Sequence, residues 1–200
     1  MQDPYVYPGT DVLRNLLNER DPTESAALEL ELASLRAVEL TGNPTGGAYD
    51  FAHLCAIHQH LFQDMYDWAG RPRTVQTAKG VPFCPPANID EQSRFIHRNI
   101  VCDEQLNSTE LDTFADRLAY HWAEVNAVHA FREGNTRTQR AFFEQLAELR
   151  GWEMDFDALD YTAFKTARHH ALVADHHQFA GVLKPILRRS IGHADPPGQP

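Results

Sequence analysis

The chain has 200 residues, of which 42% are hydrophobic and 23% are charged, and its formal net charge at pH 7 is -10. This length is enough for one domain to bury an apolar core without the support of a metal or a disulfide. The acidic balance excludes a general affinity for nucleic acid, because proteins with that property normally present a concentrated basic face.

The cysteines and the first residues bear on the cellular compartment. The cysteines are odd in number and lack the spacing of a zinc or redox motif: Cys55, Cys84 and Cys102. An odd number of cysteines without such spacing is typical of proteins in a reducing environment. The sequence has no basic start followed by an apolar run, and no stretch of about 18 apolar residues. We therefore expect a soluble cytoplasmic protein with no membrane partner.

The first third of the chain predicts three helices separated by turn signals. After a turn-rich lead, a capped helix is expected to start at 10–13 and to be broken at 21–23. From Glu24 a second helix is expected to run to 41–44, with an apolar stripe facing the core at Leu28, Leu32, Leu35 and Val38. Asp50 is a candidate N-cap for a third helix, running through His53 to Tyr66.

A short β-hairpin is expected next, within residues 71–83. The residues before Lys79 alternate in character, and Gly80 is a turn signal. Such a hairpin has an exposed edge that could pair with an extended piece of another chain.

Helical patterns return in the second half of the chain. One helix is expected to start at 88–91, after two prolines. Apolar residues then recur at steps of three and four on both sides of the segment 129–140: Leu111, Phe114, Leu118, Trp122, Val125 and Val128 before it, and Phe142, Phe143, Leu146, Ala147 and Leu149 after it. A final helical region is expected at 161–189, followed by a disordered tail at 191–200.

Eleven histidines invite a search for a metal site, but their spacing does not predict one. The pairs 169–170 and 176–177 are seven residues apart, which is about 10 Å of rise on a helix. Zinc ligands converge at about 2 Å, so one ion cannot join the two pairs without a break in the helix. We expect these histidines to be polar residues of the surface or to cap helices.

The polar segment 129–140 lies between two predicted helices and carries the strongest chemical signal. Gly134 permits a positive φ, and the helix that follows offers unpaired N–H groups to an anion. Arg137 and Arg140 are three apart, which puts both guanidinium groups on one helix face. His129 supplies a base that titrates near neutral pH, and Glu133 supplies a carboxylate suited to Mg²⁺. A lone histidine or arginine pair is usually structural, so it is their ordered coincidence that favours a phosphate site.

At these residues the chain resembles the Fic (filamentation induced by cAMP) domain proteins, whose signature is His-x-Phe-x-(Asp or Glu)-Gly-Asn-Gly-Arg-x-x-Arg. The positions that match are His129, Phe131, Glu133, Gly134, Asn135, Arg137 and Arg140. A second stretch, 57–71, is similar to the family's helix and its Tyr-x-Trp-Ala-Gly turn. The resemblance implies an all-α fold, a helical bundle with a small β-hairpin flap at about 71–83. It also implies that residues 1–190 form one domain of the single-domain bacterial kind.

The resemblance further implies an enzyme, a protein adenylyltransferase that transfers AMP from ATP to a Tyr, Ser or Thr hydroxyl of a target protein. His129 would deprotonate the hydroxyl, Phe131 would anchor the loop, and Glu133 would carry Mg²⁺ between the α- and β-phosphates. The remaining residues would bind nucleotide: Gly134, Asn135 and Thr136 as the anion hole, Arg137 and Arg140 on the β- and γ-phosphates, Arg132 as part of the positive island, and Lys79 and Gly80 at its border.

Two positions depart from the signature. Ala130 stands where the family usually has Pro, which changes rigidity but not chemistry. Thr136 replaces Gly, and a β-branched residue resists a positive φ and adds bulk beside the phosphates. Thr136 therefore leaves two alternatives open: transfer of another phosphate-linked group, such as phosphoryl or phosphocholine, or a weakened module that binds nucleotide or protein without turnover.

The resemblance also bears on partners. Bacterial relatives of this kind modify topoisomerase subunits, so such a target is plausible. Relatives often carry an inhibitory helix with the pattern (Ser or Thr)-x-x-x-Glu-(Gly or Asn). Residues Ser25 to Glu29 fit its first five positions, but Leu30 does not fit the last and the segment belongs to the predicted core stripe. We therefore interpret this match as chance, and expect a separate small antitoxin protein to supply the inhibitory helix.

Overall fold

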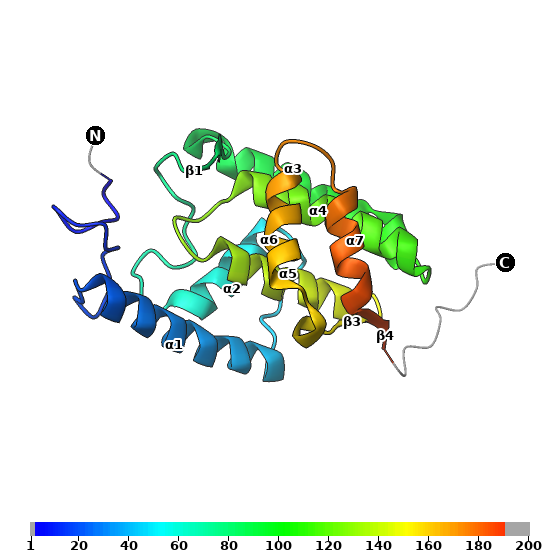
Figure 1. Ribbon diagram of the computed structural model, residues 1–200, viewed down its shortest axis with the longest axis horizontal. Helices are drawn as coiled ribbons and strands as arrows, with labels where there is room; N and C mark the ends of the chain where they lie inside the picture. Colours follow the sequence, from blue (N-terminus) through cyan, green and yellow to red (C-terminus); the bar gives the residue numbers. More distant parts are fainter. Residues whose placement is uncertain (1–2, 191–200) are drawn as a thin grey trace. The chain divides into compact units, whose positions relative to one another are not determined.

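The computed structural model describes residues 3–190, and its architecture is helical (Figure 1). The α-helices are α1 (Pro22–Gly42), α2 (Phe51–Phe62), α3 (Ile89–Cys102), α4 (Leu111–Val128), α5 (Asn135–Leu149), α6 (Tyr161–His170) and α7 (His177–Leu183). The strands are very short: β1 (Ala78–Lys79) pairs with β2 (Val81–Pro82), and β3 (Trp152–Met154) pairs with β4 (Leu187–Arg189), both antiparallel. The predicted all-α class with a small hairpin is confirmed.

The chain divides into two compact units. The first contains the described residues up to Cys102 together with Glu124–Phe142, and the second contains Asp103–Ala123 together with the described residues from Phe143 onward. The whole of the segment 129–140 belongs to the first unit. Whether residues 1–190 form one domain stays a prediction.

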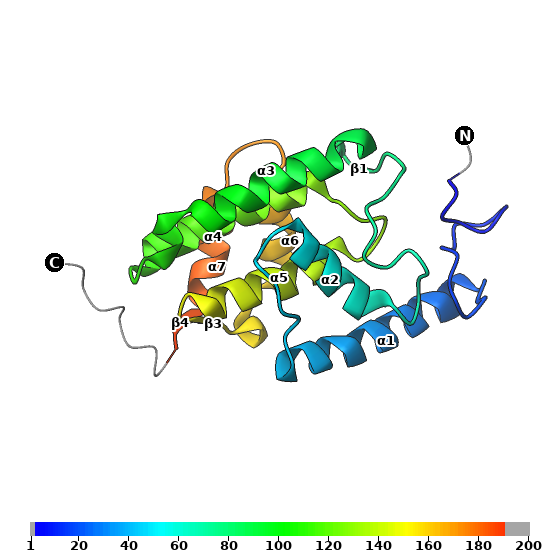
Figure 2. The ribbon, with the colours of Figure 1, turned by 180° about the vertical axis from the view of Figure 1, so that it is seen from behind.

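In the first unit α1 lies along α2, as both views show (Figures 1 and 2). Asp50 caps α2, because its side chain accepts from the backbone N–H of His53, 2.9 Å away. The N-cap prediction is therefore confirmed, although α2 ends at Phe62 rather than Tyr66. The hairpin turns at Gly80, whose φ of 77° places it in the left-handed region.

The helix expected to start at 10–13 is wrong. The chain reverses at Gly9, where φ is 77°, and the segments on either side pair as a short antiparallel ladder with a bridge between Val6 and Leu13. The residues at 21–23, predicted to break a helix, begin one instead. Asp21 caps α1 by accepting from the amides of residues 23 and 24, and Pro22 occupies the first turn, where its missing N–H costs nothing.

The apolar stripe predicted on α1 is wrong in its second half, whereas Leu28 and Leu32 of its first half are half-buried. Leu35 and Val38 are 59% and 73% exposed, whereas the buried residues of this helix are Ser25, Ala33 and Leu40. The helix is rotated relative to the prediction, so that polar side chains face its neighbours. This rotation carries Glu29 toward the interior, where its side chain is only 15% exposed.

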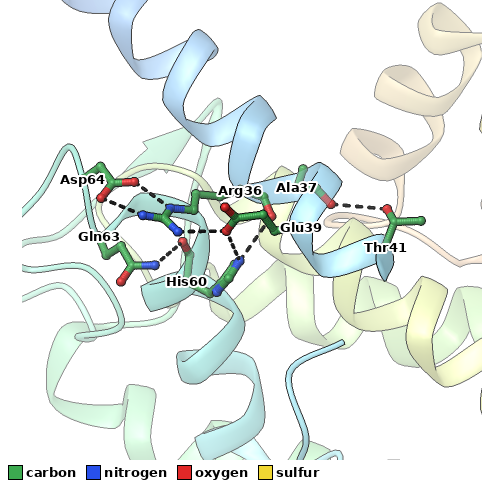
Figure 3. Close-up of polar contacts among 7 residues, drawn as sticks. All are labelled: Arg36, Ala37, Glu39, Thr41, His60, Gln63 and Asp64. Carbon is green, nitrogen blue, oxygen red and sulfur yellow. Dashed lines mark hydrogen bonds and ion pairs between the residues drawn. The ribbon is translucent and has the colours of Figure 1, made fainter. Parts of the chain in front are cut away.

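Ion pairs join the C-terminal half of α1 to the last turn of α2 and to Asp64, which follows α2 (Figure 3). The Arg36 guanidinium donates two hydrogen bonds to the Asp64 carboxylate, of 2.6 and 3.0 Å. It also forms an ion pair with Glu39 at 2.8 Å. His60 on α2 bonds the carbonyl of Arg36 at 3.2 Å. Forked guanidinium–carboxylate contacts fix orientation as well as distance, so they set the rotation of α1 about its axis.

The second unit has an aromatic core around Trp122 and a terminal ribbon that the sequence did not predict. Trp122 stacks on Phe143 with ring centroids 4.8 Å apart and meets Phe179 edge-on. The helical region predicted at 161–189 is helical over most of its length, but it is not continuous and it does not reach Arg189. It breaks after α6, resumes as α7, and gives way beyond Pro185 to β4, since proline cannot continue a helix.

Other expectations concern the cysteines, the membrane and the tail. Cys55, Cys84 and Cys102 are free thiols. No helix within residues 3–190 combines the length and the apolar content needed to cross a bilayer. The tail at 191–200 lies outside the described residues.

Candidate active site

The segment predicted to bind phosphate begins as a tight loop that one side chain closes. Residues 129–134 connect α4 to α5, and Asn135 is the first residue of α5. The Asn135 amide accepts from the N–H of Phe131 at 2.9 Å and donates to the carbonyl of the same residue at 2.7 Å. Both partners are buried, so these bonds have little competition from water. The prediction of a helix-to-helix loop is confirmed.

Gly134 is required by both conformation and space. Its φ is 78°, and a Cβ built there would lie 2.3 Å from the Phe62 ring of α2. Any other residue at this position would therefore strain the backbone and displace an aromatic ring. The close approach brings the loop directly against α2.

His58 on α2 links the loop to the turn that follows α2. Its ring stacks on Phe131 with centroids 3.9 Å apart. Its Nδ1 accepts from the N–H of Gly70 at 2.8 Å, so the ring proton lies on Nε2, which donates to the Glu133 carbonyl 3.1 Å away. Burial lowers the pKa of His58 to about 4, so the ring stays neutral and keeps both bonds at physiological pH.

His129 sits at the point where α4 ends, with a φ of 50°. This left-handed conformation is uncommon for a residue other than glycine and turns the chain sharply out of the helix. The imidazole stacks on Phe83, which follows the hairpin, with centroids 3.8 Å apart and planes 6° apart. The hairpin segment therefore fixes the plane of the His129 ring.

Arg73 holds the backbone on both sides of this contact. Its guanidinium donates to the carbonyls of Val75, Cys84, Val128 and His129, at 2.7, 2.6, 3.1 and 2.8 Å respectively. The residue is only 2% exposed, and burial lowers its pKa. One buried cation thus joins the end of α4 to both arms of the hairpin segment.

The other end of the loop offers the N-terminus of α5. The first amides of a helix have no acceptor within the helix, and the helix dipole adds positive potential there. Thr136 lies in this first turn, and it is absent from the described non-glycine residues with a positive φ, which are Asn18, Tyr49 and His129. Its β-branch therefore causes no backbone strain at the anion site.

Arg137 faces a carboxylate from α1. Its guanidinium is 4.7 Å from the centre of the Phe62 ring and bonds Glu29. Glu29 also accepts from the Tyr66 hydroxyl. Burial, followed by the charge of Glu29, raises the pKa of Tyr66, so the hydroxyl remains a donor. The interpretation of Glu29 as part of an apolar core stripe is therefore wrong, because it meets an arginine of the signature.

Glu133, the residue predicted to hold Mg²⁺, has an accessible carboxylate at the end of the loop. Its carboxylate accepts from the N–H of Gly134 at 2.9 Å and lies 3.8 Å from Arg137, and its side chain is 47% exposed. One accessible carboxylate beside an anion site suits Mg²⁺, which keeps several waters and takes its other ligands from phosphate.

The remaining predicted ligands lie at different places. Arg132 pairs with Asp3 at 2.9 Å, so its role toward nucleotide requires that pair to separate and stays a prediction. Lys79 and Gly80 are exposed at the tip of the hairpin. Arg140 lies one turn beyond Arg137 on α5, as the spacing requires.

The sequence analysis did not single out three residues that shape the site. They are His58, Arg73 and, through its contact with Arg137, Glu29. His58 and Arg73 form hydrogen bonds with backbone carbonyls and amides. Every residue has these groups, so no pattern of residue types predicts such contacts. The only available signal for Glu29 was its match to the inhibitory pattern.

The sequence matches one family model and several known proteins. The model of the Fic/DOC family matches residues 48–147, which is half of the chain. The probable protein adenylyltransferase y4lH of Sinorhizobium fredii is 38% identical over 196 residues, covering 96% of this chain and 97% of that protein. The probable protein adenylyltransferase Fic of Escherichia coli K12 is 34% identical, covering 87% of this chain and 86% of that protein.

Solved structures agree in fold. The crystal structure of the BepC protein of Bartonella tribocorum with bound AMPPNP has a TM-score of 0.84 at 22% identity, covering 94% of this chain and 97% of that one. A Fic domain of Bartonella quintana with bound ADP also has a TM-score of 0.84, at 24% identity, covering 93% and 95%.

Replacing Arg73 by Lys is expected to destabilise the chain by about 2–4 kcal/mol, because a single ammonium cannot donate to four carbonyls and leaves buried acceptors unpaired. Urea denaturation measures the change. Arg71→Lys, two residues away and exposed, is the matched control and should stay within about 0.5 kcal/mol of the wild type. Equal losses in the two variants would contradict the role given to Arg73.

His58 is expected to make the chain less stable in acid. Burial lowers its pKa from the ordinary 6.5 to about 4 in the folded chain, so its contribution to stability is complete above pH 6.5 and is lost as the pH falls toward 4. The full loss is roughly 3 kcal/mol.

Denaturation of the wild type and of His58→Gln at pH 7 and pH 4.5 measures this effect. Gln keeps a donor for the Glu133 carbonyl but does not titrate, so the variant should lose less stability on acidification than the wild type. His169→Gln, on an exposed position of α6, controls for histidines elsewhere. If His58→Gln and the wild type lose the same amount, the assignment fails.

Proposed function

Because the chain belongs to the Fic/DOC family, we propose that it is a protein adenylyltransferase, which transfers AMP from ATP to a hydroxyl of a target protein. The observation that carries the proposal is the closed loop of Phe131–Asn135. The His129 imidazole lies before this loop, and the N-terminus of α5, with its arginines, lies at the other end of the loop. A base and an anion site on one short loop are the two parts that such a transfer needs.

His129 is the general base of this reaction. It takes the proton of the attacking Tyr, Ser or Thr hydroxyl as the oxygen forms a bond to the α-phosphorus. The bond from the α-phosphorus to the bridging oxygen breaks, and pyrophosphate leaves with the electron pair. The stacking of His129 on Phe83 supports this role, because a base must be held in one orientation to act on one oxygen.

The anion site stabilises the charge that develops on the phosphates. The amides at the start of α5, with Gly134 and Asn135, surround the α- and β-phosphates, while Arg137 and Arg140 bind the β- and γ-phosphates of the leaving pyrophosphate. Glu133 would hold Mg²⁺, which neutralises charge on the α- and β-phosphates. Lys79 and Gly80 border the nucleotide from the hairpin, and Arg132 adds positive potential.

The hairpin supports recognition of the target by main-chain pairing. Its strands are only two residues long and lie at the surface, so an extended segment of a target can add to its edge. Such pairing positions a hydroxyl without reading much sequence. We propose a cytoplasmic target protein with an exposed hydroxyl residue, and a topoisomerase subunit is the first candidate to test.

Regulation has two possible sources. The chain could be the toxin of a toxin–antitoxin pair, with a separate antitoxin protein that blocks the signature arginines. The contact between Glu29 and Arg137 supports an internal source instead, since a carboxylate of the chain already occupies the guanidinium assigned to phosphate. Glu29 and Tyr66 also line a cavity of about 450 Å³, which gives the Glu29 side chain room to move away when ATP arrives.

Labelling of lysate proteins with ATP tests the transfer itself. Label is expected on protein from ATP labelled at the α-phosphate and not from ATP labelled at the γ-phosphate. His129→Ala should lose the label, because no base remains. Thr136→Gly should give at least the wild-type signal, because it removes side-chain bulk beside the proposed phosphate site and keeps the backbone amide of α5.

Two outcomes would contradict this proposal. Label from the γ-phosphate alone would favour phosphoryl transfer. Equal ATP binding by wild type and His129→Ala, with no label from either, would favour a binding module. The experiment is repeated in the Glu29→Gln background, so that inhibition by Glu29 is not mistaken for a lack of activity.

Replacing Glu29 by Gln is expected to lower the KM for ATP about five- to tenfold, because a neutral amide no longer competes with phosphate for Arg137 while it can still accept from Tyr66. Initial-rate kinetics with the purified chain measure this change. Glu31→Gln, on the exposed side of α1, is the matched control. A Glu29→Gln variant with unchanged kinetics would leave a separate antitoxin as the source of inhibition.

A further inference from the structure

A cluster outside the active site brings two imidazoles to one carboxylate in the second unit. His176 and His177 are the last residue of the α6–α7 connection and the first residue of α7, and Asp116 belongs to α4. The Nε2 of His176 and the Nδ1 of His177 each lie 3.1 Å from the same oxygen, Oδ1 of Asp116. All three atoms lie within 4.8 Å of one another.

The helix break after α6 makes this convergence possible. The sequence spacing argued against a metal because it compared the pair 176–177 with the pair 169–170 on one continuous helix. In the structure the chain leaves α6 at His170, and residues 171–176 turn before α7 begins. The partner of the second pair is a carboxylate 60 residues earlier in the chain.

The distances match those between the ligands of one metal ion. Bonds of 2.0–2.1 Å in a tetrahedral site separate neighbouring ligand atoms by about 3.3 Å. The two N–O distances of 3.1 Å are close to that value, and the two nitrogens lie within 4.8 Å of each other. The two imidazoles use different ring nitrogens, which allows adjacent residues to face the same point.

Among the described contacts, no partner of Asp116 carries a permanent positive charge, because the nearby cations pair with other carboxylates. Asp112, one turn earlier on α4, pairs with Lys184 at 2.9 Å. Asp103 pairs with Arg117 at 2.7 Å. Among residues 3–190, the ion-pair partners of Asp116 are the two imidazoles, which carry charge only when protonated. A divalent cation would supply the missing positive charge.

We propose that Asp116, His176 and His177 bind one divalent transition metal, with Zn²⁺ as the best match. Two imidazoles and one carboxylate are a ligand set that zinc uses, with water in the fourth position. His177 is 70% exposed on its side chain, so the ion enters from solvent. His176 is 18% exposed and meets the Tyr120 ring edge-on, which fixes its orientation. The bound ion would fasten the α6–α7 connection to α4.

Binding of Co²⁺ and Zn²⁺ to the full chain tests this site. The purification tag is removed, the protein is treated with a chelator, and no nucleotide is added, so that the loop near Glu133 does not recruit metal through phosphate. The wild type is expected to bind one Co²⁺ with the visible absorption of a tetrahedral complex, and Zn²⁺ should displace it. His176→Ala and Asp116→Asn should bind at least about tenfold more weakly. His169→Ala, which removes an exposed histidine of α6, should bind like the wild type.

Thermal unfolding gives a second readout that does not depend on colour. Zn²⁺ should raise the melting temperature of the wild type and of His169→Ala, and should not raise that of Asp116→Asn, because only a folded state with the site intact gains from binding. Asp116→Asn keeps the size of the side chain, so circular dichroism before the titration establishes that it is folded. If the wild type binds neither metal, or if His176→Ala binds as well as the wild type, the site does not exist.

Discussion

The active-site loop depends on the two hydrogen bonds between the Asn135 amide and the backbone of Phe131. They close five residues into a turn at the start of α5, and everything the loop presents follows from that closure. The turn needs a positive φ at Gly134, and the absence of a side chain there lets Phe62 approach. His58 then fills the space behind the loop and fixes the Glu133 carbonyl. Each of these groups is buried, so the loop is held before any ligand arrives, as efficient electrostatic stabilisation requires.

What the sequence could and could not reveal follows from how far each interaction reaches. The helices on both sides of the loop were predictable, because their apolar residues recur with the helical period, and so was the short hairpin at Gly80. Arg73 and His58 could not be found in this way, since they bond backbone atoms that every residue has. The convergence of His176 and His177 on Asp116 depends on a break in a helix and on a residue 60 positions away. No local pattern carries such information.

The error on α1 has a different cause. Counting leucines at helical spacing predicted an apolar stripe, yet Leu35 and Val38 point to solvent. Ion pairs determine the rotation of this helix about its axis, since Arg36 pairs with Asp64 and Glu29 pairs with Arg137. Directional ion pairs at two points along a helix outweigh a few weakly buried side chains in deciding which face turns inward. Periodicity alone therefore identified the helix but not its inner face.

This mode of attachment also affects how the active site can be controlled. An apolar interface is insensitive to what binds nearby, whereas an ion pair competes directly with any other anion for the same cation. Glu29 pairs with Arg137, the guanidinium that we propose for the phosphates of ATP, so under the proposed function the position of α1 and the occupancy of the anion site are coupled through one guanidinium. The fork between Arg36 and Asp64 lies about two helical turns from Glu29, so α1 can stay anchored there while the Glu29 side chain yields. Under the proposed function, exchange of one anion for another requires only a movement of the Glu29 side chain, and the closed loop of Phe131–Asn135 need not change.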